Sequence, residues 1–157
     1  MTIRIDDPWA RAGVLGVATG MRSLTPLAAL AKAAREGGEG LPDWLRSRGL
    51  AVAIAVAARG EMLFDKLPSA PSRLAPVPLA YRAALGGLVG ALAVRRAGHP
   101  PALGAGLGAA AAVAGAFAGN QLRKLAREAT GLPDAVFAVA EDALALALAR
   151  AGAGIGS

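Results

Sequence analysis

The sequence predicts an all-α, polytopic membrane protein of about five helical spans. Hydrophobic residues make up 55% of the 157 positions and charged residues only 18%, and the mean hydropathy is +0.47. Residues 97–122 contain no Asp, Glu, Lys or Arg, and about 20 predominantly apolar residues suffice to cross a bilayer. Because Leu, Val and Ala cover all sides of this run, it offers no polar face to water. The length of the run disfavours the alternative, an alanine-rich soluble bundle.

Span one is expected over residues 10–34, with a break in its middle. Gly20 loosens the backbone, and Pro26 cannot donate a helical hydrogen bond. Arg22, Ser23 and Thr25 lie between these two residues. The break therefore brings one cation and two hydroxyl groups together inside an apolar segment, where polar groups are costly.

Span two is expected over residues 45–67 and carries most of its charge in its second half. Glu61 and Asp65 are four residues apart, so both carboxylates lie on one helical face. Pro68 ends the span. Snorkelling toward the headgroups accounts for Asp65 more simply than for Glu61, because Asp65 is closer to the helix end.

Three more spans are expected over residues 79–94, 102–122 and 133–150. The first two of these contain glycines spaced four apart, the small-x3-small pattern of closely packed membrane helices. The pairs are Gly86 with Gly90, Gly104 with Gly108, and Gly115 with Gly119. The last span carries Glu141 and Asp142 near its middle.

An internal repeat divides the single domain, residues 1–157. A Lys-x-Ala-Arg-Glu run followed by Gly-Leu-Pro-Asp occurs at 32–43 and again at 124–134, with one inserted residue in the first copy. Repeat one then covers about 9–68, a central span about 76–96 and repeat two about 102–151. One separating span makes the offset odd, so an inverted 2+1+2 topology is predicted, as in many transporters. Chance matching in an Ala- and Gly-rich chain is the alternative.

Several function classes are disfavoured by what the chain contains. The net charge of +6 comes from cations at the ends of apolar runs, not from a basic patch with aromatic residues, so no nucleic-acid partner is expected. The chain has no Cys, and its only histidine, His99, adjoins two prolines, so no metal site or cofactor is expected. No assembled catalytic constellation is present, so no enzyme activity is predicted.

Four motifs resemble the bacterial family known as domain of unknown function 4126. They are Gly-Met-Arg-Ser-Leu-Thr-Pro at 20–26, Glu-x3-Asp-Lys-Leu-Pro at 61–68, Gly119, and the helix with Glu141 and Asp142. The resemblance covers nearly the whole chain. It implies an integral protein of the bacterial inner membrane and no particular activity, because the family has none assigned.

The function predicted from these residues is a small channel or secondary transporter for an ion or small solute. Ionisable residues at membrane depth are functional candidates by default, and the expected path is lined by Arg22, Ser23, Thr25, Glu61, Asp65, Glu141 and Asp142. The alternative is a membrane scaffold or lipid-associated assembly factor, in which Arg22 pairs with Glu61 or Glu141 to lock helices together. The glycine pairs also suggest a homodimer. Lys and Arg near the span ends are evenly divided, so the membrane orientation stays open.

Overall fold

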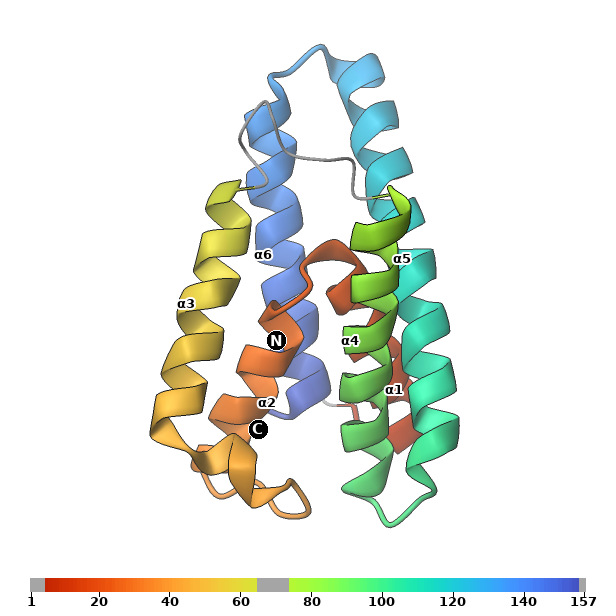
Figure 1. Cartoon of the computed structure of the whole chain (residues 1–157). Helices are drawn as coiled ribbons and strands as arrows, with labels where there is room; N and C mark the ends of the chain where they lie inside the picture. The colour runs from red at the N-terminus through yellow and green to blue at the C-terminus, as the bar shows by residue number, and fades with distance from the viewer. Residues whose placement is uncertain (1–4, 65–73, 156–157) are drawn as a thin grey trace.

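The computed structural model describes residues 5–64 and 74–155, and all regular structure in these ranges is helical, as predicted. The elements form an upright bundle (Figure 1). In chain order they are α1 (Pro8–Met21), α2 (Thr25–Arg35), the 3₁₀ helix η1 (Asp43–Arg46), α3 (Arg48–Phe64), α4 (Pro76–Arg95), α5 (Pro101–Thr130) and α6 (Asp134–Ala153).

The first predicted span is a helical hairpin and not one kinked helix. In Figure 1, α1 rises from the lower end of the bundle to mid-height, the chain reverses, and α2 descends again. Both ends of the hairpin lie at the same end of the bundle: the Trp9 and His99 rings are 5.3 Å apart, and Gly40 touches Arg96. With 14 and 11 residues, α1 and α2 are only about 21 and 16 Å long. The hairpin therefore enters the bundle and leaves it on the same side.

The remaining α-helices alternate in direction: α3 rises, α4 descends, α5 rises and α6 descends (Figure 1). The two Gly-Leu-Pro-Asp turns consequently lie at opposite ends of the bundle, and α3 and α6 run in opposite directions, as an inverted repeat requires. However, α1 and α5 both rise, because the first span reverses. An odd offset inverts the whole second copy only if span one passes through the bundle completely, whereas α1 and α2 return to the end where α1 begins.

Close helix packing holds α1 between α4, α5 and α6. A Cβ atom added to Gly20 would lie 2.1 Å from the carbonyl oxygen of Ala112 on α5, and one on Gly90 would lie 2.2 Å from that of Gly104. The pairs Gly86 with Gly90 and Gly104 with Gly108 thus face each other within one chain, whereas Gly115 packs against Val17 on α1 and Gly119 lies next to Glu141 and Met21. They give no separate argument for a dimer.

The helix boundaries follow from local sequence. Asp7 caps α1 by accepting a hydrogen bond from the Ala10 N–H at 2.7 Å, and Pro8 occupies the first helical position. Gly131 and Gly154 adopt left-handed backbone angles at the ends of α5 and α6.

At the lower end of the bundle, Arg96 donates a hydrogen bond to the Ala153 carbonyl at 3.0 Å. Burial, together with nearby Arg11, lowers the pKa of Arg96.

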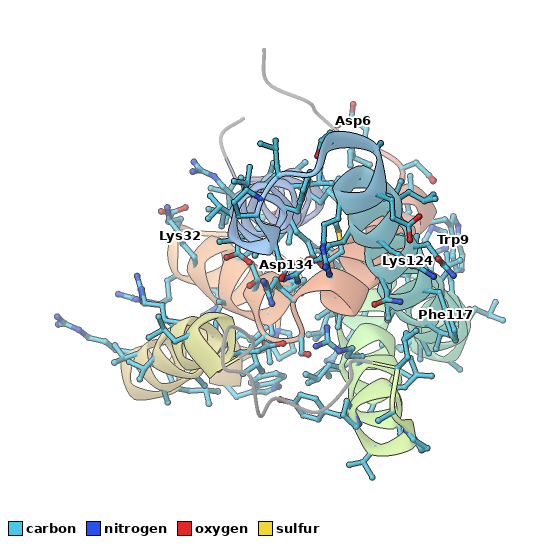
Figure 2. The ribbon with its side chains drawn as sticks, turned by 90° about the horizontal axis from the view of Figure 1, so that it is seen from above. Asp6, Trp9, Lys32, Phe117, Lys124 and Asp134 are labelled. Carbon is cyan, nitrogen blue, oxygen red and sulfur yellow. The ribbon has the colours of Figure 1, made fainter. Side chains whose placement is uncertain are left out.

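The outer surface of the bundle carries many large apolar side chains. Only α4 and α5, among the described helices, combine the length and hydropathy needed to cross a membrane. Large apolar side chains are nevertheless exposed on α3, α5 and α6, among them Val56, Phe117 and Leu144. Figure 2 shows Phe117 and Lys32 extending outward on different sides of the bundle. This surface and the two long apolar helices are consistent with membrane association.

Candidate functional site

The hairpin tip, residues 22–24, brings two helix ends into the middle of the bundle. The last carbonyl groups of α1 and the first N–H groups of α2 lack partners within their own helices. These ends carry partial charges of about −0.5 and +0.5, respectively. A tip buried inside the protein therefore needs an anion beside α2 and a cation beside α1.

Glu61 on α3 supplies the anion. Its Oε1 accepts a hydrogen bond from the Ser23 N–H at 2.9 Å, and its Oε2 accepts one from the Leu24 N–H at 3.1 Å. Leu24 is the N-cap residue of α2 and has no side chain that could do this itself. A carboxylate from another helix thus performs the task that Ser, Thr or Asp performs at most helix starts.

Arg82 on α4 supplies the cation. Its Nη1 donates to the carbonyl oxygens of Gly20 and Met21, at 2.7 and 3.2 Å, at the end of α1. Its Nη2 lies 3.6 Å from Glu61 Oε1, so the two tip partners also form an ion pair. Both helix ends are therefore matched by opposite charges, and those charges bind each other.

Arg22 in the tip itself pairs with α6. Its side chain is only 1% exposed, and its Nε donates to Asp142 Oδ1. The sequence suggested Glu61 or Glu141 as the partner of Arg22, but the structure gives Asp142. We call Arg22, Glu61, Arg82 and Asp142 the tip cluster.

A second set of charges lies directly above the tip cluster. Glu141 is buried, and its Oε2 lies 3.6 Å from Nη1 of Arg123 on α5. Arg123 also holds Asp134, through both carboxylate oxygens. A Cβ atom on Gly119 would lie 3.2 Å from Glu141 Oε1, so the glycine leaves room for this carboxylate. Since Glu141 and Asp142 are consecutive, α6 links the two sets.

The charges of these two sets nearly balance. Three arginines (Arg22, Arg82 and Arg123) face four carboxylates (Glu61, Asp134, Glu141 and Asp142). The arginines of the tip cluster are buried, whereas the side chains of Glu61 and Asp142 each remain 17% exposed. Within the described ranges, no group of three or more His, Asp and Glu side chains is placed to hold a metal ion. Within the tip cluster, the more accessible groups are thus the carboxylates, while Arg123 of the second set is 21% exposed.

The structure brings most of the predicted path residues together. Arg22, Ser23, Glu61 and Asp142 meet at the hairpin tip, and Glu141 lies beside them. Thr25 is buried but faces a separate cavity between α2, α3 and α6. Asp65 lies outside the described residues.

The two residues expected to break the first helix have other roles. Gly20 lies inside α1, where the absence of a side chain allows close contact with α5. Pro26 lies in the first turn of α2. There its missing N–H costs nothing, so it starts the second helix.

Sequence reasoning missed Arg82 and Arg123. Arg82 lies six residues after the start of α4, where a cation is usually interfacial, yet it is buried at the hairpin tip. A usable signal was its isolation: between Pro76 and Val94 it is the only charged residue. Arg123 belongs to the polar end of α5, where its sequence neighbours are exposed.

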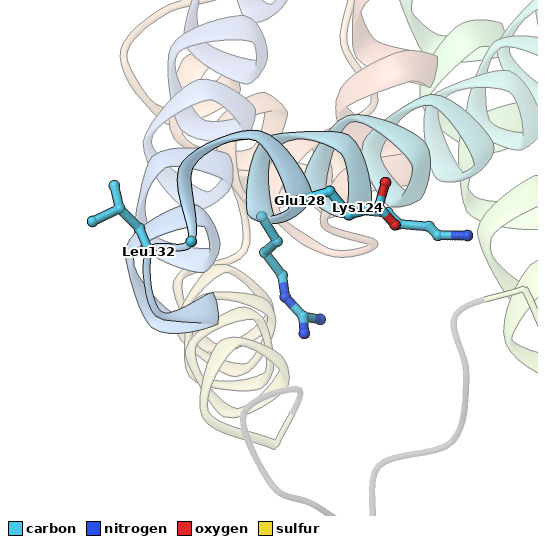
Figure 3. Close-up of a pocket in the computed structure, with 5 residues that line it drawn as sticks. Lys124, Glu128 and Leu132 are labelled. Carbon is cyan, nitrogen blue, oxygen red and sulfur yellow. The ribbon is translucent and has the colours of Figure 1, made fainter.

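Two cavities can be described. One, of about 510 Å³, lies at the turn between α5 and α6 and is lined by exposed side chains. Figure 3 shows Lys124 and Leu132 extending to opposite sides there, so these side chains do not converge on a common point. The other, of about 460 Å³, reaches Thr25, the first residue after the hairpin tip.

Comparison with known proteins places the chain in a family. No curated protein and no solved structure matches it. A family model described as Domain of unknown function (DUF4126) matches residues 10–153, which include every helix of the bundle except the first two residues of α1. The resemblance noted from the motifs is therefore confirmed, and the chain is a member of the DUF4126 family.

Proposed function

We propose that this protein is a small multi-pass membrane channel or secondary transporter, and that an ion or small solute passes the hairpin tip. In this proposal α3, α4, α5 and α6 cross the bacterial inner membrane, and α1 and α2 form a re-entrant hairpin. α4 and α5 are long and apolar enough for the crossings, and α3 and α6, with 17 and 20 residues, have the length of short spans. The inverted-repeat relationship is retained for α3 and α6, which run in opposite directions.

One observation carries the proposal: two half-height helices end at mid-bundle, and both ends are held by charged residues. Membrane transporters bind substrates and coupling ions at such broken helices, where helix ends provide partial charges. Non-helical backbone at membrane depth is tolerated only where protein covers it or it lines a cavity. The partial exposure of Glu61 and Asp142 favours a cation or proton as the species that meets the site.

A liposome flux assay tests the proposal. Purified protein is reconstituted, and fluxes of protons, sodium, potassium, chloride and fluoride are measured in turn. We expect flux of one species, lost or reshaped in Glu61→Gln and Asp142→Asn, while both variants stay folded. Glu36→Gln serves as the matched control, because Glu36 is an exposed carboxylate paired only with Lys32 at 3.6 Å.

The same pairing of charges supports a second candidate, a non-transporting scaffold or assembly factor. Arg22 and Arg82 are buried in ion pairs that join α1, α3, α4 and α6. In some proteins, buried ion pairs select one arrangement of the helices without adding stability. If no species shows flux and Glu61→Gln lowers only the stability, the result would support the scaffold. If flux occurs and neither variant changes it, the hairpin tip does not line the path.

A further inference from the structure

A lateral groove between α2, α3 and α6 combines apolar walls with cationic edges. Its volume of about 460 Å³ falls within the range of small-molecule sites, about 300–1,000 Å³. Five alanines of α2 and α3 line it, together with Leu146 and Ile155. Leu146 is 47% exposed, so the groove continues into the apolar outer surface of α6. Such a wall suits a hydrocarbon chain, which gains from leaving water and needs no hydrogen bonds.

The charged residues around the groove all have the same sign. Its lining includes four basic side chains and, among the described residues, no carboxylate; the four are Lys32, Arg35, Arg59 and Arg150. Lys32 and Arg35 lie in the last turn of α2, and Arg150 lies in the last turn of α6.

The surrounding protein offsets these cations only in part. Each helix C-terminus contributes about −0.5 charge, and Glu36 pairs with Lys32 in an exposed contact at 3.6 Å, which is a weak interaction. Arg59 is on α3 and does not lie at the C-terminus of α2 or α6. Among the described residues it donates to the Ala55 carbonyl, at 3.4 Å. An excess of positive charge therefore remains at the edge of an apolar groove.

Thr25 adds an independent observation inside the groove. Its side chain is 5% exposed, and its Oγ1 is buried without a hydrogen-bond partner among the described residues. Thr25 lies seven residues before Lys32, which is about 10 Å along α2. Buried hydroxyl groups are normally hydrogen-bonded, so a ligand oxygen at this end of the groove would complete the site.

We propose that the lateral groove binds an anionic phospholipid, with its phosphate at the basic residues, an acyl chain against the alanines, and Thr25 donating to a lipid oxygen. Anionic headgroups are attracted by clustered Lys and Arg at a membrane surface. The inference rests on the membrane location proposed above, but it does not require transport.

Retained lipid, measured by native mass spectrometry, tests the inference without any flux assay. The protein is loaded with phosphatidylglycerol or phosphatidylcholine, and a third sample receives inorganic phosphate in detergent alone. We expect preferential retention of phosphatidylglycerol. Arg150→Gln should weaken it about fivefold, as one cation near a membrane surface does. Arg95→Gln, an exposed cation outside the groove lining, should leave it unchanged.

A second pair of variants tests where the chain lies. Ala55→Phe fills the groove and should reduce retention strongly, whereas Ala53→Phe, on an exposed position of the same helix outside the lining, should not. Four results would overturn the inference: equal retention of both lipids, binding of phosphate alone to the same extent, equal effects of Ala55→Phe and Ala53→Phe, or a second protein copy in place of lipid. Retained lipid with no flux would overturn only the transport proposal. Flux without selective lipid retention would overturn only the lipid site.

Discussion

Glu61 caps a helix to which it does not belong: its carboxylate lies 2.9 Å from the Ser23 N–H at the start of α2, although Glu61 is part of α3. The same carboxylate binds Arg82, which holds the end of α1. One side chain thus fixes a chain reversal and joins three helices.

Removing the Glu61 carboxylate should loosen the hairpin. Glu61→Ala leaves two buried N–H groups without their acceptor and removes the carboxylate that pairs with Arg82, so we expect the free energy of unfolding to fall by about 3 kcal/mol. Glu61→Gln keeps one acceptor oxygen and should cost about 1 kcal/mol. Thermal and denaturant unfolding in detergent measures both. Equal stability of Glu61→Ala and the exposed control Glu36→Ala would contradict the capping role.

Arg22 and Asp142 should be strongly coupled. Arg22→Met places an apolar side chain beside the Asp142 carboxylate, and Asp142→Asn removes the negative charge that Nε of the buried Arg22 binds. Each single variant should therefore be less stable, while the double variant should cost less than the sum. We expect a coupling energy of about 1–3 kcal/mol from the double-mutant cycle. Additive effects would show that the ion pair contributes nothing to joining the hairpin tip to α6.

Arg82 should require its guanidinium and not only its charge. Three contacts diverge from this side chain, to the Gly20 and Met21 carbonyls and to Glu61. The planar guanidinium satisfies them with fixed geometry, which a lysine ammonium cannot reproduce. Arg82→Met should lower the free energy of unfolding in detergent. We expect Arg82→Lys to restore less than half of that loss. Full rescue by lysine would mean that charge alone matters at the end of α1.

The sequence allowed the charged break to be predicted, but not its geometry. Pro26 and the isolated Arg22 indicate an interruption of the helix. These two residues are equally compatible with a kinked helix and with a full reversal of the chain. The reversal depends on Glu61 and Arg82, which lie 35 or more positions further along the chain and reach the tip only in the folded protein. For the same reason Arg82, near a helix start, resembled an ordinary interfacial cation. The partner of Arg22 was open because three carboxylates were available to it.

Gly20 and Gly13 form a matched pair in α1 that separates packing from helix propensity. A Cβ atom at position 20 would lie 2.1 Å from the Ala112 carbonyl oxygen on α5, whereas nothing lies within 4 Å of a Cβ atom at position 13. Gly13→Ala should raise stability by up to about 1 kcal/mol, because alanine favours the helix. Gly20→Ala should lower it by about 1–3 kcal/mol, because two backbones must separate. If both substitutions stabilise the protein in detergent unfolding, then α1 does not lie against α5 as described, and the hairpin tip has no fixed support beside it.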